Sequence, residues 1–405
     1  MVKSLFDNIE QCGKNTLIVK QIILHFLNHG TDTIANISKA LNLSVPTVNK
    51  FLEEMSVHGI VKKQGKLEVG GGRHPASFGL NPEACYFGGV DIKISSVSMA
   101  VIDFCGNIVL KRDNIPYTMA NTPESLDELC ALIREFLNDV PVDKADILSM
   151  SVNISGRVNS SNGYSYSLFN FGNRPLADIL AQKVGIRMNI DNDTRAMAYG
   201  EYVCGRPHDY RNIIFVNVSW GIGIGIVIDG KIYTGKSGFA GEIGHMVTYN
   251  NEEICHCGKK GCLETEASGR ALHRKLRQRL DGGANSLIAS LYREKGDITL
   301  DDILDAVKRE DLLCLELIED VGRELGRWLA GMINIFNPEA VIVGGVLTET
   351  GDYLLQPISV AMRRYSLNLV NKDTHIALSK LGRDAGVLGA CAIARNKTFE
   401  DILIV

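Results

Sequence analysis

The stretch from 212 to 235 reads NIIFVNVSWGIGIGIVIDGKIYTG, an apolar run that turns at DG (229–230) and continues as a second extended segment. A similar pattern occurs at 85–115, CYFGGVDIKISSVSMAVIDFCGNIVLKRDNI, with its turn at CGN (105–107). Apolar runs separated by short glycine-containing turns predict β-hairpins. The repetition predicts two lobes, each with a sheet that opens on a hairpin and is covered by helices. Ligands generally bind in clefts between such lobes.

The length of 405 residues exceeds one compact core and is typical of two or three domains. A composition of 45% hydrophobic and 22% charged residues argues against disorder, collagen and coiled coil. No apolar run approaches the ~18–20 residues of a membrane span. The N-terminus MVKSLFDNIEQ is polar where a signal peptide would be hydrophobic. We therefore expect a cytoplasmic protein without membrane contact.

The formal net charge of −4 conceals an uneven distribution along the chain. Residues 1–80 contain nine lysines and arginines against six aspartates and glutamates, whereas the remaining 325 residues contain 34 against 41. This division indicates a small basic module attached to a larger acidic one.

The basic module shows three short amphipathic patterns. The first runs from Thr16 to Asn28, the second begins with Thr33 as its N-cap, and the third begins with Ser44 as its cap and Pro46 in its first turn. Three short helices with a tight turn between the last two predict a helix-turn-helix.

Two short strands, IVKKQ (60–64) and ASFGL (76–80), follow the helices and are joined by a glycine-rich, basic tip. They favour the winged version of the motif, in which the third helix reads the major groove and basic residues contact phosphates. A helical dimerisation or protein-docking unit is the alternative. The predicted DNA contacts are Pro46, Thr47, Asn49 and Lys50 on the third helix, and Lys62, Lys63, Lys66 and Arg73 on the wing.

Three of the ten cysteines, Cys255, Cys257 and Cys262, lie within eight residues, and His245 precedes them by ten. Free thiols are expected in a chain without an export signal. Three thiolates and an imidazole form a closed tetrahedral shell, which is typical of a structural zinc site. The alternatives are a turn of free thiols, or a site in which His256 replaces His245.

The larger, acidic part of the chain contains five motifs that are specific enough to compare with known families. They are IDNDTRAMAYGEY (190–202), SGFAGEIGH (237–245), CHCGKKGCLETEAS (255–268), VIVGGV (341–346) and LGRDAGVLGACAIA (381–394). With them the chain resembles the ROK family of sugar kinases and sugar-responsive repressors, from about Cys85 to the C-terminus. In the repressor branch a helix-turn-helix precedes this region.

The resemblance implies an α/β protein with an N-terminal winged helix-turn-helix at 1–82 and an actin-like, ribonuclease-H-like ROK domain at 83–405. That domain is expected to have two lobes. Lobe 1 covers about 83–195 together with the C-terminal helix at about 383–405, and lobe 2 covers about 196–382.

The resemblance also implies a sugar site, and it favours His245 over His256 as the ligand of one structural zinc per chain. His245 would then bind zinc with one ring nitrogen and sugar with the other. Helix-surface or capping charge is the alternative for Glu242 and Glu264. The implied sugar ligands are Asn170, Asn192, Asp193, Glu242, His245 and Glu264, with the Gly156 backbone allowing close approach of the ring.

Asp193 occupies the position of the general base in the family's kinases, but the two phosphate loops depart from the family pattern. The first reads Asp91-Ile92-Lys93-Ile94-Ser95 where the kinases have Asp-x-Gly-Gly-Thr. The second reads Ser219-Trp220-Gly221 where they have Gly-Thr-Gly. Because Lys93 and Trp220 are bulky, we expect no ATP and no catalysis. Gly221 and Gly223 can serve strand packing instead, and Gly344-Gly345 can be a mere turn.

These features predict a sugar-responsive repressor that binds a pseudo-palindromic operator as a homodimer or a dimer of dimers. Its effector is a sugar or a sugar phosphate, and Lys93 is a candidate to receive the phosphate. The alternatives are an ATP-dependent kinase of hexoses or aminosugars that retains a DNA-binding arm, and a scaffold that does not bind DNA.

Overall fold

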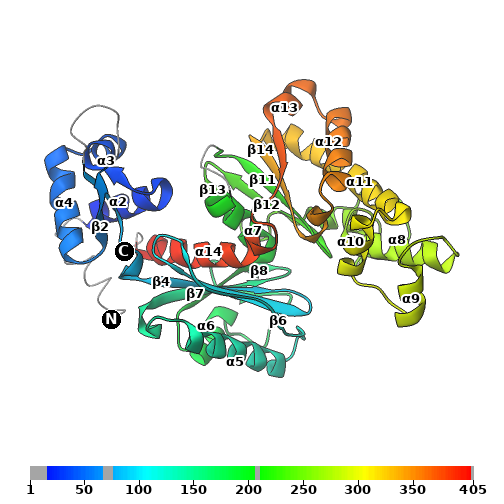
Figure 1. The fold of residues 1–405 in the computed structure, drawn as a ribbon, viewed down its shortest axis with the longest axis horizontal. Coiled ribbons are helices and arrows are strands. Elements are labelled where there is room, and N and C mark those ends of the chain that lie inside the picture. Colours follow the sequence, from blue (N-terminus) through cyan, green and yellow to red (C-terminus); the bar gives the residue numbers. More distant parts are fainter. Residues whose placement is uncertain (1–15, 67–75, 206–209, 403–405) are drawn as a thin grey trace. The chain divides into compact units, whose positions relative to one another are not determined.

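The computed structural model describes residues 16–66, 76–205 and 210–402 (Figure 1). The chain forms two compact units, Met1–Asp193 with Val387–Val405, and Thr194–Gly386. Within the described ranges, no helix is long and apolar enough to cross a lipid bilayer. The winged helix-turn-helix region belongs to the first unit.

The three predicted N-terminal helices are confirmed. The Thr33 hydroxyl accepts from the Asn36 N–H at 3.3 Å, and the Ser44 hydroxyl accepts from the Thr47 N–H at 3.2 Å, so both predicted caps are formed. The inner face of the third helix is fully buried at Val48, Leu52 and Met55. The helices are α2 (Thr16–His29), α3 (Ile34–Leu41) and α4 (Val45–Val57).

The two wing strands are also confirmed, as β2 (Val61–Lys66) paired antiparallel with β3 (Ala76–Leu80). A third strand, β1 (Asp32–Thr33), pairs with the other edge of β3. The sequence does not predict β1, because two residues are too few to show an alternating pattern. The wing tip, with Arg73, lies outside the described residues.

The first unit contains a five-stranded sheet with the order β10-β7-β4-β5-β6. The hairpin predicted at 105–107 joins β5 to β6, and β7 and β10 run parallel to β4. The strands are β4 (Tyr86–Ile92), β5 (Ser96–Asp103), β6 (Ile108–Pro116), β7 (Ile147–Ile154) and β10 (Met188–Asn192).

Helices cover both faces of this sheet (Figure 1). Helices α5 (Pro123–Asp139) and α6 (Leu176–Val184) pack on one face, and α14 (Ala385–Ile402) packs on the other. A Cβ on Gly89 of β4 would lie 2.5 Å from the Val387 carbonyl oxygen, so α14 runs directly across the strand backbone. The short elements of this unit are Pro82–Ala84, Lys144–Asp146, β8 (Val158–Asn159) and β9 (Tyr164–Ser165).

The second unit contains a five-stranded sheet with the order β13-β12-β11-β14-β15. The predicted hairpin turn is confirmed at Asp229 and Gly230, whose φ angles of 50° and 79° suit a two-residue turn. The strands are β11 (Ile213–Val218), β12 (Ile222–Ile228), β13 (Lys231–Ile232), β14 (Ala340–Gly344) and β15 (His375–Leu378).

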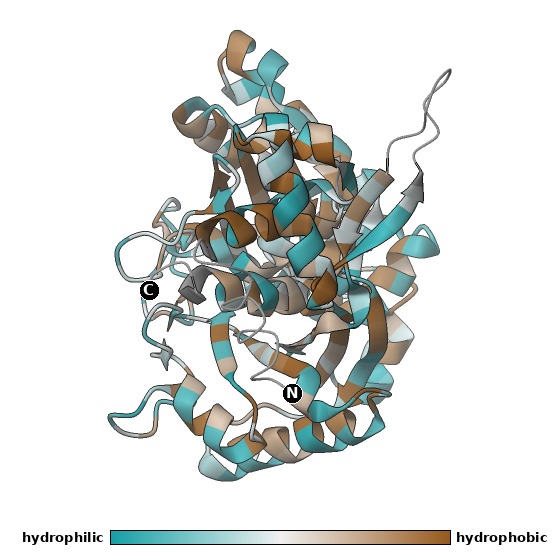
Figure 2. Ribbon diagram, turned by 90° about the vertical axis from the view of Figure 1, so that its left-hand side faces the viewer, coloured by the Kyte–Doolittle hydropathy of each residue, from teal (hydrophilic) through white to brown (hydrophobic). Residues whose placement is uncertain are grey.

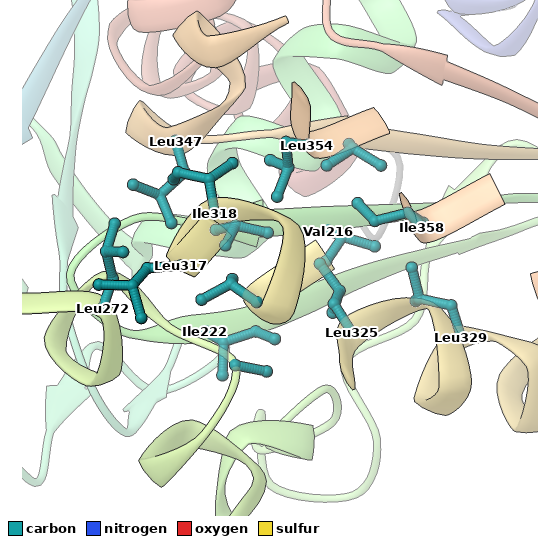
Figure 3. Packing of buried hydrophobic residues seen from close by; sticks show 14 of the residues in the cluster. Val216, Ile222, Leu272, Leu317, Ile318, Leu325, Leu329, Leu347, Leu354 and Ile358 are labelled. Carbon is teal, nitrogen blue, oxygen red and sulfur yellow. The ribbon is translucent and has the colours of Figure 1, made fainter. Parts of the chain in front are cut away.

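One face of this sheet packs on a large helical layer centred on α11 (Leu312–Phe336), whose residues Leu317, Ile318 and Leu325 lie near Val216 and Ile222 of the sheet (Figure 3). Helix α7 (Asp193–Gly200) packs on the other face. The remaining helices are α8 (Gly269–Asp281), α9 (Ala289–Lys295), α10 (Leu300–Lys308), α12 (Asp352–Tyr365) and α13 (Asn368–Asp373), with short turns at Glu201–Gly205, Ile243–His245, Leu263–Thr265, Val346–Thr350 and Gly382–Asp384.

Both units therefore repeat one plan. In each, three antiparallel strands are followed by two strands parallel to the first, and helices lie on both faces. Surface helices carry hydrophobic residues on one side and hydrophilic residues on the other (Figure 2). This repetition is the actin-like α/β architecture that the sequence predicts. The units divide at 193/194 and at 386/387.

Candidate functional site

Three of the predicted sugar ligands meet in the first unit, where β7 and β10 end. The Asn192 amide donates to the Gly156 carbonyl and to one Asp193 carboxylate oxygen, both at 3.0 Å. Gly156 has a φ of +90°, and a Cβ there would lie 2.6 Å from the Ser167 hydroxyl, so glycine is required. The predicted close-approach position is therefore free of a side chain.

Ser155 belongs to this group, although the sequence did not single it out. Its hydroxyl donates to the second Asp193 oxygen at 2.6 Å. The available signal was its place directly after β7, since the carboxyl ends of parallel neighbours β7 and β10 lie at one edge of the sheet. Both Asp193 oxygens are thus held by hydrogen bonds, which fixes the orientation of the carboxylate.

Asn170 occupies a different setting from the other predicted ligands of the first unit. It is exposed, and within the described residues its side chain makes no hydrogen bond. The preceding residue, Phe169, is buried with a φ of 55°, and its N–H is held by the Asn121 side chain at 2.6 Å. The backbone that presents Asn170 is therefore anchored, while its amide is open to solvent.

The first altered phosphate loop lies in the electrostatic field of Asp193. Asp91 is buried at the end of β4, and the Asn153 amide donates to it at 3.4 Å. Burial raises the pKa of the Asp91 carboxyl to about 6; Lys93 opposes this shift, and the negative charge of Asp193 adds to it. Lys93 therefore offsets part of the charge that two neighbouring aspartates would place here.

The four predicted metal ligands meet in the second unit. The ligand atoms of His245, Cys255, Cys257 and Cys262 all lie within 4.8 Å of one another. The Cys255 sulfur lies 3.5 Å from His245 Nδ1, and the Cys257 and Cys262 sulfurs are 3.6 Å apart. Ligands about 2.3 Å (sulfur) and about 2.0 Å (nitrogen) from a tetrahedral ion stand roughly 3.5–3.8 Å apart. This cluster can hold a metal ion.

Glycines shape the turn that carries the cysteines, as the sequence predicts. Gly258 and Gly261 have φ angles of 86° and 71°, and the Gly258 N–H donates to the Cys255 carbonyl at 2.8 Å. Burial raises the pKa of the Cys255 thiol to about 12. At Cys257 burial also raises the pKa of the thiol. Hydrogen bonds from the Lys259 backbone and the neighbouring thiols outweigh this effect and leave the pKa below its ordinary value. A bound cation would favour the thiolate form of both.

His256 contacts a different partner from His245. Its Nδ1 lies 2.7 Å from a Glu264 carboxylate oxygen, and its ring centre lies 4.9 Å from that of His245. Cys255, His256 and Glu264 form a second group with metal-ligand spacing, but this group lacks the other two cysteines. The larger group, with His245, matches the ligand set that the family pattern favours.

Glu264 and Glu242 differ in their surroundings. Glu264 is only 5% exposed, and its second oxygen accepts from the Ile222 N–H at 3.3 Å, so the interpretation of Glu264 as surface charge is wrong. Glu242 is partly exposed and lies 3.7 Å from His245 Nε2. Both carboxylates thus border the metal cluster, Glu264 from within the fold and Glu242 from its surface.

The second altered phosphate loop is hydrogen-bonded to Val346, directly after Gly344-Gly345. The Ser219 hydroxyl donates to the Asn217 side chain at 2.6 Å and accepts from the Val346 N–H at 3.2 Å. Trp220 projects from this loop, 37% exposed, with its ring centre 5.4 Å from that of His273. The loop's hydroxyl is therefore committed to the protein itself.

The glycine alternation on β12 has a packing role. A Cβ on Gly225 would overlap the Ala198 side chain of α7, and one on Gly223 would lie 3.0 Å from the Thr194 hydroxyl. These contacts let α7 lie directly on the strand. The alternation therefore has a sufficient explanation in the fold, without a bound phosphate.

The predicted base-reading residues occupy the first half of α4. Pro46 and Lys50 are exposed. The Thr47 hydroxyl lies 2.7 Å from that of Ser44, and the Asn49 amide donates to Glu53 at 2.8 Å. The sequence prediction missed Glu53 and its neighbour Glu54, which lies 3.8 Å from the Lys50 ammonium group.

Lys62 and Lys63, two of the predicted phosphate contacts on the wing, differ in whether they form an ion pair. Lys62 forms an exposed ion pair with Glu83 at 3.0 Å. Lys63 is exposed and has no hydrogen bond or ion pair within the described residues. Lys63 is therefore the better placed of the two to meet a phosphate.

Comparison with known proteins gives a consistent result. The ROK family model matches residues 87–397. The "Xylose repressor" of Caldicellulosiruptor bescii is 29% identical over 94% of this chain and 94% of its own length. The "Glucokinase" of Halalkalibacterium halodurans is 31% identical over 75% of this chain and 93% of its own. A crystal structure of a ROK family transcriptional regulator, a homologue of the Escherichia coli MLC protein, has a TM-score of 0.80 at 26% identity, covering 96% and 98% of the two chains.

Proposed function

The chain belongs to the ROK family, and on this premise we propose that it is a sugar-responsive transcriptional repressor. One observation carries the proposal: a capped helix-turn-helix with wing strands precedes the family domain. The xylose repressor matches this chain nearly from end to end, whereas the glucokinase match spans three quarters of it. A kinase needs no DNA-binding module, and a repressor does.

The effector that we propose is a sugar or a sugar phosphate. Each buried sugar hydroxyl needs hydrogen-bond partners, and carboxylates accept strongly. The first unit offers Asn192 and Asp193 with the open Gly156 position, and the second offers Glu242, His245 and Glu264. Asn170 and Lys93 are further candidate contacts on the first unit.

We propose zinc as the metal, one ion per chain, held by His245 and the three cysteines. Thiolate and imidazole ligands suit zinc, and four protein ligands leave no place for a reactive water. The ion would therefore be structural. Its chemistry is to fix the turn and orient His245, whose other ring nitrogen lies 3.7 Å from Glu242.

The alternative, a sugar kinase with a DNA-binding arm, rests on Asp193, which is held by Ser155 in a fixed orientation. Three features of the phosphate loops favour the repressor. Lys93 and Trp220 are bulky where the kinases have small residues, and the Ser219 hydroxyl is committed to Val346. We propose that the chain binds no ATP and catalyses no phosphoryl transfer.

The repressor acts in the cytoplasm as a homodimer or a dimer of dimers on a pseudo-palindromic operator, because one α4 helix offers too few base contacts for tight binding alone. The sugar shifts operator affinity only through its different affinities for the DNA-bound and released states.

The test is a titration of the full chain, bound to DNA from its own promoter, with xylose, glucose, N-acetylglucosamine and their phosphates. We expect at least one to lower operator affinity. If none does, the sensing role is wrong. ATP-dependent phosphorylation of one of these sugars that disappears in Asp193→Asn would instead establish the kinase.

DNA reading is tested separately at α4. We expect Asn49→Ala to relax base preference at one operator position by about 1–3 kcal/mol. Lys50→Ala should lower affinity for all sequences and flatten its salt dependence, since it removes a phosphate contact. Binding that is independent of both residues would favour the docking unit over the DNA reader.

A further inference from the structure

A cavity of about 480 Å³ lies in the second unit, between α8 and the turn that carries the cysteines. Trp220 lines it, together with four residues from one stretch of α8, Arg270, Arg274, Arg277 and Gln278. Of the predicted sugar ligands it shares only Glu264. Its volume lies within the range of about 300–1,000 Å³ that small-molecule sites occupy.

Most charged groups of this cavity are satisfied by one another. Arg274 is ion-paired with Glu253, Arg277 lies 3.8 Å from Asp297, and Asp297 also lies 3.0 Å from the His273 ring. These pairs leave the walls polar but locally balanced. A ligand with a polyphosphate chain would extend along the acidic members of the pairs and be repelled.

Two polar side chains on α8 remain without a partner. Arg270 and Gln278 are exposed, and within the described part of the chain neither side chain makes a hydrogen bond or an ion pair. The Arg270 N–H donates to the Trp220 carbonyl at 2.9 Å, so the free guanidinium and the exposed indole come from adjoining backbone. The cavity wall therefore carries one unpaired positive charge and one exposed indole, on backbone segments that are hydrogen-bonded to each other.

We propose that this cavity binds an anionic monosaccharide, a sugar ring with one acidic group. The acid pairs with Arg270, since guanidinium groups recognise phosphate and carboxylate in a bidentate manner. The apolar face of the ring packs on Trp220, and the hydroxyl groups bond Gln278 and the wall carboxylates. The cavity shares Glu264 with the proposed sugar ligands, but it contains none of the first unit, and its binding does not require Asp193.

The chain contains two tryptophans, Trp220 and Trp328, and Trp328 packs against the helical core. A Trp328→Phe chain therefore reports on this cavity through the fluorescence of Trp220 alone. We expect saturable changes in emission when the zinc-loaded full chain is titrated with glucose 6-phosphate or glucuronate. Response to only one of the two identifies phosphate or carboxylate as the source of the charge. Glucose and inorganic phosphate should each bind at least tenfold more weakly.

Variants on α8 locate the binding. Arg270→Ala should weaken it by about ten- to a hundredfold, since a charged hydrogen bond is lost. Arg279→Ala is the matched control, because Arg279 lies on the same helix and pairs with Glu316 outside the cavity. Asp193→Asn should leave this binding unchanged, which separates it from the proposed sugar site.

The proposal is overturned if neither acid produces a saturable change, if Arg270→Ala binds as the parent does, or if Asp193→Asn abolishes the signal. Tighter binding of ATP than of both acids would also overturn it, since a triphosphate would then be the preferred ligand.

Discussion

The two units share one sheet topology but fasten their candidate ligands in different ways. In the first unit Ser155, Asn192 and Asp193 follow parallel strands, and side-chain hydrogen bonds lock them together. In the second unit His245 and Glu264 lie in short turns around the cysteines that follow no strand, and Glu264 reaches the sheet only through the Ile222 N–H of β12. The same sheet topology can thus support a site whose residues follow sheet strands and a site whose residues surround a cluster of possible metal ligands. The first is held by the fold alone, and the second has the ligand set that could hold a metal ion.

Loss of the metal should give the largest difference between the units. Under the proposed zinc site, we expect Cys262→Ser to release the ion and to destabilise the second unit by about 3 kcal/mol or more, because the binding free energy of a structural metal adds to the stability of the fold. Metal analysis and hydrogen exchange would measure both effects. Cys105→Ser makes the same chemical change at an exposed cysteine of the first unit, and it should alter neither the metal content nor the hydrogen exchange. Equal protection of the second unit with and without zinc would contradict the distinction.

The buried Asp91 should give the first unit a pH dependence of its own. Its pKa is 3.8 in the unfolded chain and about 6 in the fold, so the folded state holds the proton longer and loses stability as pH rises through this window. Asp91→Asn removes the titration. Relative to the parent, it should therefore gain up to about 3 kcal/mol between pH 4 and pH 7.

Urea midpoints at the two pH values check this, with Asp178→Asn on the exposed side of α6 as the control. The same difference from the parent at both pH values would show that the Asp91 carboxyl does not titrate in this window.

Substitutions of the strand glycines that lie against helices, Gly225 in the second unit and Gly89 in the first, should differ in whether they can be rescued. Gly225→Ala should cost about 2 kcal/mol, because its Cβ overlaps Ala198. Gly89→Ala in the first unit meets backbone atoms of α14 instead. Adding Ala198→Gly should therefore restore much of the loss at Gly225, and no single side-chain change should rescue Gly89. Thermal unfolding measures all three, and Gly282→Ala, which has room, is the control.

Ser155→Ala should have the smallest effect. It removes one hydrogen bond to Asp193, so sugar response should weaken by about 1 kcal/mol with little change in stability. The measurement is the sugar concentration at which half of the operator is released, and Ser161→Ala, at an exposed position in the loop after β8, is the control. A stability loss with an unaltered sugar response would make Ser155 a packing residue only.

The sequence pattern correctly predicted the features that depend only on residues close together in the chain. The helix caps at Thr33 and Ser44, both hairpin turns and the glycines of the cysteine turn are all set by neighbours in the chain. The cysteine cluster was visible because its ligands are close in sequence.

Contacts between distant residues could not be predicted in this way. Ser155 meets Asp193 across 38 positions, and Glu264 reaches the Ile222 backbone across 42. Such pairings depend on how strands align, and a single sequence gives no measure of distance between them. The Asn49–Glu53 pair is local, at an interval of four residues on one helix, so the spacing could have predicted it.

The acidic residues of α4 have a consequence for the search along the genome. Helix α4 reads VPTVNKFLEEMSV, with one lysine against two glutamates, and Asn49 and Lys50 are already engaged by Glu53 and Glu54. On unrelated DNA the two glutamates would offset part of the attraction between Lys50 and the phosphates, so α4 would add little to residence on wrong sites. If Asn49 reads a base, as we propose, that base replaces Glu53 as its partner at the right site. In the proposed complex, α4 would thus contribute more to selectivity than to affinity, and wing residues such as Lys63 would supply phosphate contacts.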